Sequence, residues 1–238
     1  MKLFLSKSYP LLAAITLASA LLFTSPAHAQ FSGVKWSRDN SNSPEQDKSG
    51  KGSTPSTKNA TNNQGTYQFK ITTSSTSGTQ RQEFKYERRK GYMQMQTEFR
   101  ISNSTKNFDK IALAQNHDDQ KGSEGVFSIY QVRKSGSSYV FGVQGDTKEA
   151  NNGYSKFDTV KIKTGKYYRL KIRSYIAGKS NSVEVAELYD GNKRIWRETV
   201  KGGGDSEGYY KIGAYKLSGG KGPITADFKK TRFWKGSK

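Results

Sequence analysis

The sequence predicts an all-β protein, an antiparallel β-sandwich of jelly-roll type. Apolar and polar residues alternate along several short segments, as in residues 67–71, 93–101 and 169–173, and a period of two is typical of strands. Glycine-rich turns separate the segments, for example residues 190–192 and 201–204. No segment carries a long apolar stripe at helical spacing. Many short strands joined by polar turns favour two packed sheets.

The N-terminus has the pattern of a removable signal peptide. Lys2 and Lys7 form a short basic region, residues 11–23 are almost wholly apolar, and an Ala-His-Ala sequence ends at Ala29. We therefore expect cleavage near Ala29, with Gln30 as the first mature residue, and a secreted or periplasmic protein. The apolar run is too short to span a bilayer comfortably, so we expect no membrane insertion.

Residues 30–66 precede the body of the fold. Phe31, Val34 and Trp36 predict a short N-terminal strand that packs on the body. The remainder of this segment is rich in Ser, Asn, Lys, Gly, Thr and Pro, which indicates a polar, low-complexity loop or linker. Residues 67–238 have the length of one domain and contain no internal repeat, and we expect a monomer.

The mature chain would carry a large positive charge. The formal net charge is +20, and removal of residues 1–29 takes away Lys2, Lys7 and no acid, which leaves +18. Such an excess predicts a polyanionic partner, unless it serves only solubility. Export and the lack of a helix-turn-helix or zinc-finger pattern argue against nucleic acid. The lack of a basic amphipathic helix argues against a membrane surface. We expect an acidic polysaccharide as the partner.

The residue types present limit the possible chemistry. The chain has no cysteine, which excludes disulfides, thiol nucleophiles and Cys–His zinc sites, and we expect neither a metal nor another cofactor. The mature form would keep one histidine, His117, because His28 lies in the signal peptide. A single histidine is more often a surface or packing residue. His117 is nevertheless a candidate acid or base, because no other histidine competes for the role.

Three predicted strands each place polar side chains on one face, because neighbouring residues of a strand point to opposite sides. These side chains are Arg81, Glu83, Lys85 and Glu87 on the first, Gln115 and His117 on the second, and Tyr209, Lys211 and Tyr215 on the third. Phe84 and Ile212 lie on the opposite, core-facing side, and Asn116 points away from His117. Each segment alone could be an ordinary solvated face. Together they predict one polar, solvent-facing sheet side that lines a cationic concave cleft.

These segments resemble the motifs of family 7 polysaccharide lyases, the alginate lyases. Residues 81–85 are similar to the family's Arg-x-Glu-x-Arg, residues 115–117 to its Gln-Ile/Val-His, and residues 209–215 to its Tyr-Phe-Lys-Ala-Gly-x-Tyr. The three motifs occur in the family's order and span most of the body.

The sequence departs from the family pattern at three places. Lys85 stands where an Arg is usual, Asn116 where an aliphatic residue is usual, and Lys216-Leu217 where the motif usually ends in Gln. The Lys-Ile-Gly-x-Tyr form at residues 211–215 is also similar to jelly-roll lyases that act on glucuronan or heparin-like chains. The resemblance therefore implies a lyase of acidic polysaccharide, with alginate as the first candidate and glucuronan or a heparin-like polymer as the alternative.

The resemblance implies β-elimination at a uronate residue. Arg81 and Gln115 would hold and neutralise the carboxylate, which stabilises the developing enolate. Tyr215 would donate a proton to the departing O4, and either Tyr215 or His117 would remove the C5 proton. A tyrosine serves in this way near neutral pH only when cations surround it, and Lys211 would contribute to that. The residues expected to bind substrate are Lys211, Lys85, Glu83 and Tyr209, of which Glu83 would orient Arg81.

Other function classes remain open from the sequence. Hydrolysis by paired carboxylates is one, because acids such as Glu184 and Glu187 are present, although none falls in a recognisable glycosidase motif. A non-catalytic carbohydrate-binding module is another. It would use the same cationic face with Trp36, Trp196 or Trp234 as a stacking platform. A secreted nucleic-acid binder is the third.

Overall fold

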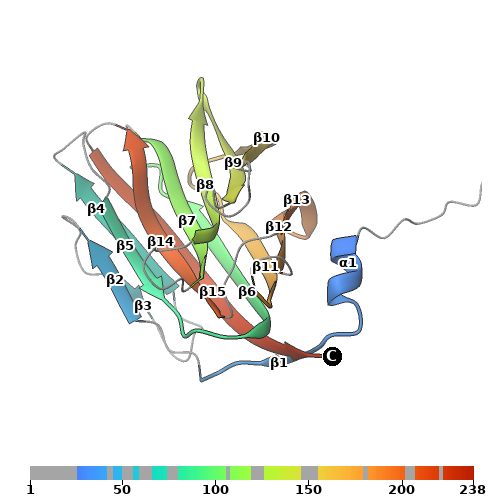
Figure 1. Cartoon of the computed structure of the whole chain (residues 1–238). Coiled ribbons are helices and arrows are strands. Elements are labelled where there is room, and N and C mark those ends of the chain that lie inside the picture. The colour runs from blue at the N-terminus through green and yellow to red at the C-terminus, as the bar shows by residue number, and fades with distance from the viewer. Residues whose placement is uncertain are drawn as a thin grey trace, which may run out of the picture.

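The computed structural model consists of two antiparallel sheets packed face to face, with one short helix in the part of the chain that it describes (Figure 1). This confirms the prediction of an all-β antiparallel sandwich. The structure describes residues 26–41, 45–49, 56–58, 66–73, 80–105, 108–118, 126–145, 155–178, 182–201, 207–219 and 222–238. Residues 1–25 of the predicted signal peptide lie outside the described residues. The expected cleavage point after Ala29 falls inside α1 (Pro26–Phe31).

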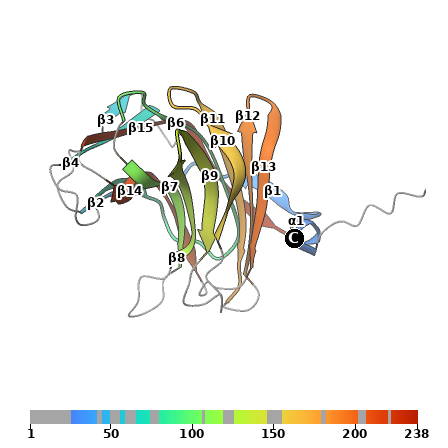
Figure 2. The ribbon, with the colours of Figure 1, turned by 90° about the horizontal axis from the view of Figure 1, so that it is seen from above.

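Each sheet has a simple strand order, and the two lie as layers when seen from above (Figure 2). The eight-stranded sheet runs β13 (Lys193–Lys201), β12 (Val183–Asp190), β11 (Tyr168–Ile176), β6 (Gly91–Ile101), β15 (Gly222–Ser237), β4 (Thr66–Thr73) and β3 (Ser56–Lys58), with β1 (Lys35–Arg38) paired to β15. The seven-stranded sheet runs β10 (Ser155–Ile162), β9 (Ser138–Gly145), β8 (Val126–Ser135), β7 (Phe108–Asp118), β14 (Gly208–Gly219), β5 (Gln80–Lys85) and β2 (Glu45–Ser49).

Alternating side chains place the core between the two sheets. Along β11 every second residue is buried, because the inward side of a strand packs on the opposite sheet. Aromatic rings join the layers: Phe84 of β5 lies edge-on to Tyr67 at 4.7 Å and to Phe69 at 5.2 Å, both from β4. Phe69 in turn meets Phe228 of β15 at 5.4 Å. Burial of each such ring contributes about 2–3 kcal/mol to folding.

The polar segment before the body holds more structure than a loop or linker would. It contains β2 and β3, which pair with β5 and β4 at the edges of the two sheets. An edge strand bonds through one side only, and a polar sequence blunts further pairing there. The strand β1 pairs with the end of β15, and Trp36 on it stacks on Phe31 of α1 at 6.4 Å.

A carboxylate lies inside the sandwich, between the two sheets. Glu184 of β12 is fully buried and accepts hydrogen bonds from Ser128 and Tyr130 of β8. It also accepts from Ser174 of β11 at 2.5 Å and from the side-chain nitrogen of Asn116 of β7 at 2.6 Å. Glu184 therefore links both sheets through four donors, and its place in the core argues against a role as a glycosidase carboxylate.

Replacement of Glu184 by Gln should change how stability depends on pH. Burial is the main cause that raises the pKa of Glu184 above its ordinary value of 4.5, against the opposing effect of its hydrogen-bond donors. A carboxyl with a raised folded-state pKa takes up a proton on folding. Its contribution is complete below the unfolded-state pKa and is lost as the pH rises through the folded-state pKa. Urea unfolding at a series of pH values should show this decline in the wild type and not in Glu184→Gln.

Glu187→Gln is the matched control, because it alters a neighbouring carboxylate of the same strand. Burial raises the pKa of Glu187, but Arg173 and Arg194 outweigh that effect and leave it lowered. Its contribution is therefore present above the unfolded-state pKa and lost as the pH falls. Glu184→Gln should remove a fall in the free energy of unfolding with rising pH, whereas Glu187→Gln should remove a rise. Identical pH profiles for the wild type and Glu184→Gln would contradict a titrating carboxyl in the core.

Candidate functional site

The three motifs of the sequence lie side by side in the seven-stranded sheet, on β7, β14 and β5 (Figure 1). The register places Tyr209 opposite His117 and Lys211 opposite Gln115. On the other side of β14, Lys211 also stands opposite Lys85. Strands distant in sequence thus bring the predicted residues to one face, here called the motif face. It is the side of this sheet that points away from the core.

Gly213 allows β14 and β5 to approach closely in the middle of this face. A Cβ atom at Gly213 would lie 2.3 Å from the carbonyl oxygen of Gln82 and 2.7 Å from the Cα of Glu83. Any larger residue would therefore force the two strands apart. The glycine of the third motif is required by this contact between backbones.

Glu83, Gln115 and His117 form a buried chain of hydrogen bonds across the three strands. The Nε2 of Gln115 donates to Glu83 Oε1. Because a carboxylate only accepts, the amide oxygen of Gln115 is turned toward His117, whose Nε2 lies 3.1 Å away. In this arrangement His117 donates from Nε2, and the basic lone pair of the neutral ring is on Nδ1. Glu83 therefore fixes the histidine tautomer through Gln115.

Tyr209 lies at the centre of a cluster of cations. Its ring stacks on the ring of His117 with centroids 5.2 Å apart and planes 17° apart. Lys85 Nζ lies 5.0 Å from the Tyr209 ring centroid, Arg88 Cζ 5.6 Å and Lys211 Nζ 5.8 Å. Arg88 is not among the residues predicted from the sequence, although the basic run just after β5 was a signal for it. The cluster concentrates positive charge beside the histidine.

Arg81 and Tyr215 stand opposite each other, farther along the strands. Tyr215 is paired on its other side with Ala112, five residues before His117, which is about 17 Å of strand. The register therefore brings Tyr209, and not Tyr215, directly beside the histidine. Glu83 connects the two groups, because it lies two residues from Arg81 on the same face of β5 and bonds to Gln115.

Burial on the motif face is greater than the sequence indicated. Gln115 is 1% exposed and Lys211 3% exposed, so the expectation that Gln115 faces solvent is wrong. The reason is that its amide is held between Glu83 and His117. Arg81 and Tyr215 are half-buried and so keep surface that a ligand can reach.

Tyr210, between Tyr209 and Lys211, points into the core. Its hydroxyl donates to the carbonyl oxygen of Met93 at 3.2 Å and lies 2.7 Å from the hydroxyl of Ser174. Burial, and then the charge of Glu184, raises the pKa of Tyr210 well above its ordinary value. Tyr210 is therefore unsuited to proton transfer at the surface.

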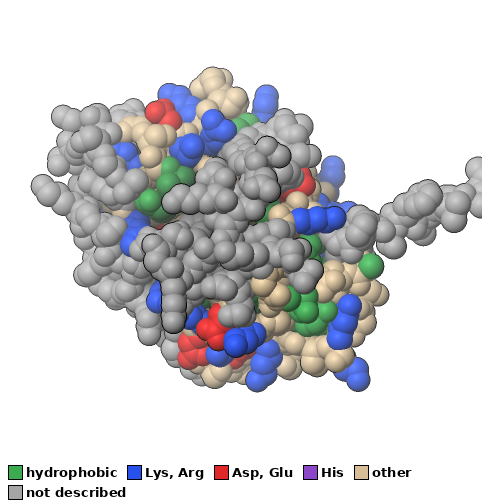
Figure 3. All heavy atoms as spheres, viewed as in Figure 1, with side chains coloured by type: hydrophobic (Ala, Val, Ile, Leu, Met, Phe, Trp, Pro, Cys, Tyr) green, Lys and Arg blue, Asp and Glu red, His purple; other side chains and the backbone are tan. Residues whose placement is uncertain are grey.

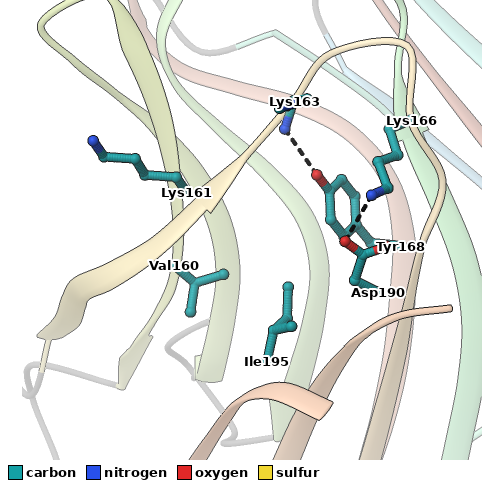
Figure 4. A pocket seen from close by; sticks show the side chains of 7 residues that line it. All are labelled: Val160, Lys161, Lys163, Lys166, Tyr168, Asp190 and Ile195. Carbon is teal, nitrogen blue, oxygen red and sulfur yellow. Dashed lines mark hydrogen bonds and ion pairs between the residues drawn. The ribbon is translucent and has the colours of Figure 1, made fainter. Parts of the chain in front are cut away.

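Two pockets help to place the site. One of about 250 Å³ is lined by residues 85–88 and lies beside the Tyr209 cluster. Another of about 350 Å³ lies between the edge strands β10 and β13 and contains none of the predicted site residues (Figure 4). Lys161, Lys163 and Lys166 line it, and Lys166 is paired with Asp190 at 2.6 Å. The geometry favours the motif face as the functional site.

Within the described ranges, no group of three or more His, Cys, Asp or Glu side chains could hold a metal ion. The helix found in the described part of the chain is neither long nor apolar enough to cross a membrane.

Comparisons with known proteins show the fold. No family model matches the sequence, and no curated protein matches it. An endo-β-1,4-glucuronan lyase from Trichoderma reesei is similar in structure, with a TM-score of 0.59 and 12% identity, over 84% of this chain and 94% of that chain. An alginate lyase from Klebsiella pneumoniae has a TM-score of 0.52 and 12% identity, over 71% and 81%.

The alginate lyase AlgAT5 from polysaccharide lyase family 7 is also similar, with a TM-score of 0.50 and 16% identity, over 73% of this chain and 79% of that chain. The family that the motifs resemble is thus found among proteins of this architecture. At such identities the likeness establishes the architecture alone. The chain has the jelly-roll fold of the alginate and glucuronan lyases, as its sequence predicts.

Proposed function

We propose that the protein is a secreted polysaccharide lyase that cleaves an acidic, uronate-containing polysaccharide by β-elimination. The observation that carries this proposal is the Glu83–Gln115–His117 chain beside the cations around Tyr209. It combines a base of defined tautomer with positive charge, on three motifs that resemble those of lyases. The shared fold and the signal-peptide pattern support the proposal.

β-Elimination requires both the base and the positive charge of this site. A base removes the C5 proton, the electron pair forms the C4–C5 double bond, the C4–O4 bond breaks, and O4 gains a proton. Negative charge develops on the uronate carboxylate during this step, and Arg81 with nearby lysines would stabilise it. His117 would take the proton at Nδ1, which is buried in this structure and must become accessible for this step, while Gln115 accepts its Nε2–H bond.

Two tyrosines of β14 are candidates for the proton donor. Tyr215 matches the motif and faces Arg81, whereas Tyr209 stacks on His117. If Tyr215 acts together with His117, their side chains must lean toward each other along the strands. If Tyr215 acts alone, it performs both proton transfers, as a syn elimination permits. The stacking of Tyr209 on His117 supports a third combination, in which these two residues act as the pair.

Alginate is the first candidate substrate, because the three motifs resemble those of alginate lyases. Glucuronan is the second, favoured by Asn116, which departs from the alginate-lyase motif, and by the extensive match to a glucuronan lyase. A non-catalytic binding module is less well supported. Trp196 is buried in the core, and Trp36 and Trp234 lie on the other sheet, so none of the three is a stacking platform on the motif face.

The mature protein should generate unsaturated uronate ends from one of these polymers. Incubation with alginate, glucuronan, heparin and hyaluronan, followed by ultraviolet absorbance, measures this directly. We expect product from alginate or glucuronan. Binding without product on all four polymers would contradict the lyase proposal and favour the binding module.

Tyr→Phe variants at residues 209 and 215, together with His117→Ala, should identify the proton-transfer groups. Phenylalanine keeps the ring and removes the hydroxyl. Severe loss of turnover in both Tyr215→Phe and His117→Ala indicates that Tyr215 and His117 act as the pair. Severe loss of turnover in both Tyr209→Phe and His117→Ala indicates that Tyr209 and His117 do. Loss in Tyr215→Phe with mild loss in His117→Ala indicates that Tyr215 transfers both protons. Near-normal turnover in both tyrosine variants, with polymer binding retained, would rule out a tyrosine acid.

Arg81→Ala should lower turnover about a hundredfold, as expected when one charge-stabilising donor is lost. Arg81 is half-buried at the surface of the motif face, so the circular dichroism spectrum should stay unchanged. Arg81→Lys is the control: it keeps the charge without the bidentate fork and should recover part of the loss. Wild-type activity in Arg81→Ala would exclude it from carboxylate binding.

A further inference from the structure

The outer face of the eight-stranded sheet, on the opposite side of the sandwich from the motif face, is also strongly basic. Along β11, Leu170 and Ile172 point into the core, while the residues between them point outward. We name as the basic face the outward cations Arg169, Lys171 and Arg173 of β11, Arg194 and Arg197 of β13, Arg232 of β15 and Arg38 of β1. Figure 3 shows lysine and arginine side chains spread widely over the part of the surface it displays, with fewer acidic ones.

The register arranges part of the basic face as a row across five strands. In order, the row is Arg197, Glu187, Lys171, Gln96 and Arg232, each opposite the next. With strands about 4.8 Å apart, the row is about 19 Å long. Such a row offers repeated charge and amide groups to a linear polymer that lies across the strands.

Positive charge on this face is only partly neutralised. Glu187 is the one carboxylate shared by Arg194 at 2.9 Å, Arg173 at 3.1 Å and Arg197 at 4.0 Å. Burial, and then Arg173, lowers the pKa of Lys171. Burial and the nearby Arg232 likewise lower the pKa of Arg38. Cations that repel one another in this way would be stabilised by an anionic ligand.

Aromatic rings hold several of these cations and add surface for sugar contacts. The guanidinium of Arg38 lies 4.9 Å from the ring of Trp234, and that of Arg169 lies 4.3 Å from the ring of Tyr189. Stacking of this kind fixes the planar fork of arginine for bidentate contact with carboxylates. Trp234, one of the tryptophans that the sequence suggested as stacking platforms, therefore lies on the basic face.

We propose that the basic face is a second binding surface for acidic polysaccharide, which holds one part of a polymer while the motif face acts on another. The polymer's identity rests on the function proposed above, whereas the choice of a polyanion rests on charge complementarity. A sheet face with glutamine amides between its cations suits a hydroxylated chain better than a lipid surface, because binding to lipid favours the insertion of apolar side chains. Attachment at a second point raises the effective concentration of substrate at the first.

The test compares two double variants that each remove two positive charges. Lys171→Gln/Arg232→Gln alters the row on either side of Gln96 and leaves the cations that contact Glu187 in place. Lys161→Gln/Lys163→Gln, at the pocket between β10 and β13 (Figure 4), is the matched control. Thermal unfolding should show both variants folded. Affinity for long alginate and glucuronan is measured by titration, so the result does not depend on turnover.

We expect the row variant to bind long polymer about tenfold more weakly than the control variant does. Its KM for polymer should rise, while its kcat/KM on a short oligouronate, too short to reach both faces, should match the control. Equal polymer affinity in the two double variants would overturn the proposal. So would a row variant that loses duplex DNA binding but keeps polyuronate binding, because the face would then serve nucleic acid. If no variant or wild type turns over any polymer but the affinity difference persists, the lyase proposal fails and the second surface stands.

Discussion

The pairing of β14 with β7 on one side and with β5 on the other is the constraint on which the candidate site depends. It brings residues from three distant parts of the chain to one face. Gly213 makes the pairing close enough, because a Cβ there would meet the carbonyl oxygen of Gln82 at 2.3 Å. Gln115 donates to Glu83 and accepts from His117, and because these hydrogen bonds extend across the strands, they depend on that closeness.

The strand β7 connects the site to the core, because its side chains alternate between the two. Gln115 and His117 point to the motif face, while Asn116 between them donates to Glu184 inside the sandwich. An aliphatic residue would pack in the core at this position but could not satisfy the carboxylate. Asn116 and Glu184 are therefore a matched pair, and the departure from the lyase motif at Asn116 is explained by a partner 68 residues away.

The sequence was sufficient for features that depend on local periodicity. Alternation in residues 81–87 and 209–215 predicts which side chains face the core, and Phe84, Ile212 and Ala214 are buried there. The register between the strands could not be predicted from the sequence, because bulges in β7 and β14 set which residues stand opposite one another. The stacking of Tyr209 on His117 and the burial of Gln115 follow from register and packing. The edge strands β2 and β3 were missed because edge strands need no apolar alternation.

The two outward faces of the sandwich differ in how they accommodate side chains that carry the same charge. On the motif face, cations gather around the ring of Tyr209, and the acid Glu83 is committed to orienting an amide. On the basic face, three arginines share Glu187, and stacking on rings holds others in place. The core between stacked sheets is about 10 Å thick, so the groups of one face cannot neutralise those of the other. If both faces bind one polyanion, as we propose, that polymer must reach around the molecule, and the affinity of the protein would then depend on the length of its ligand.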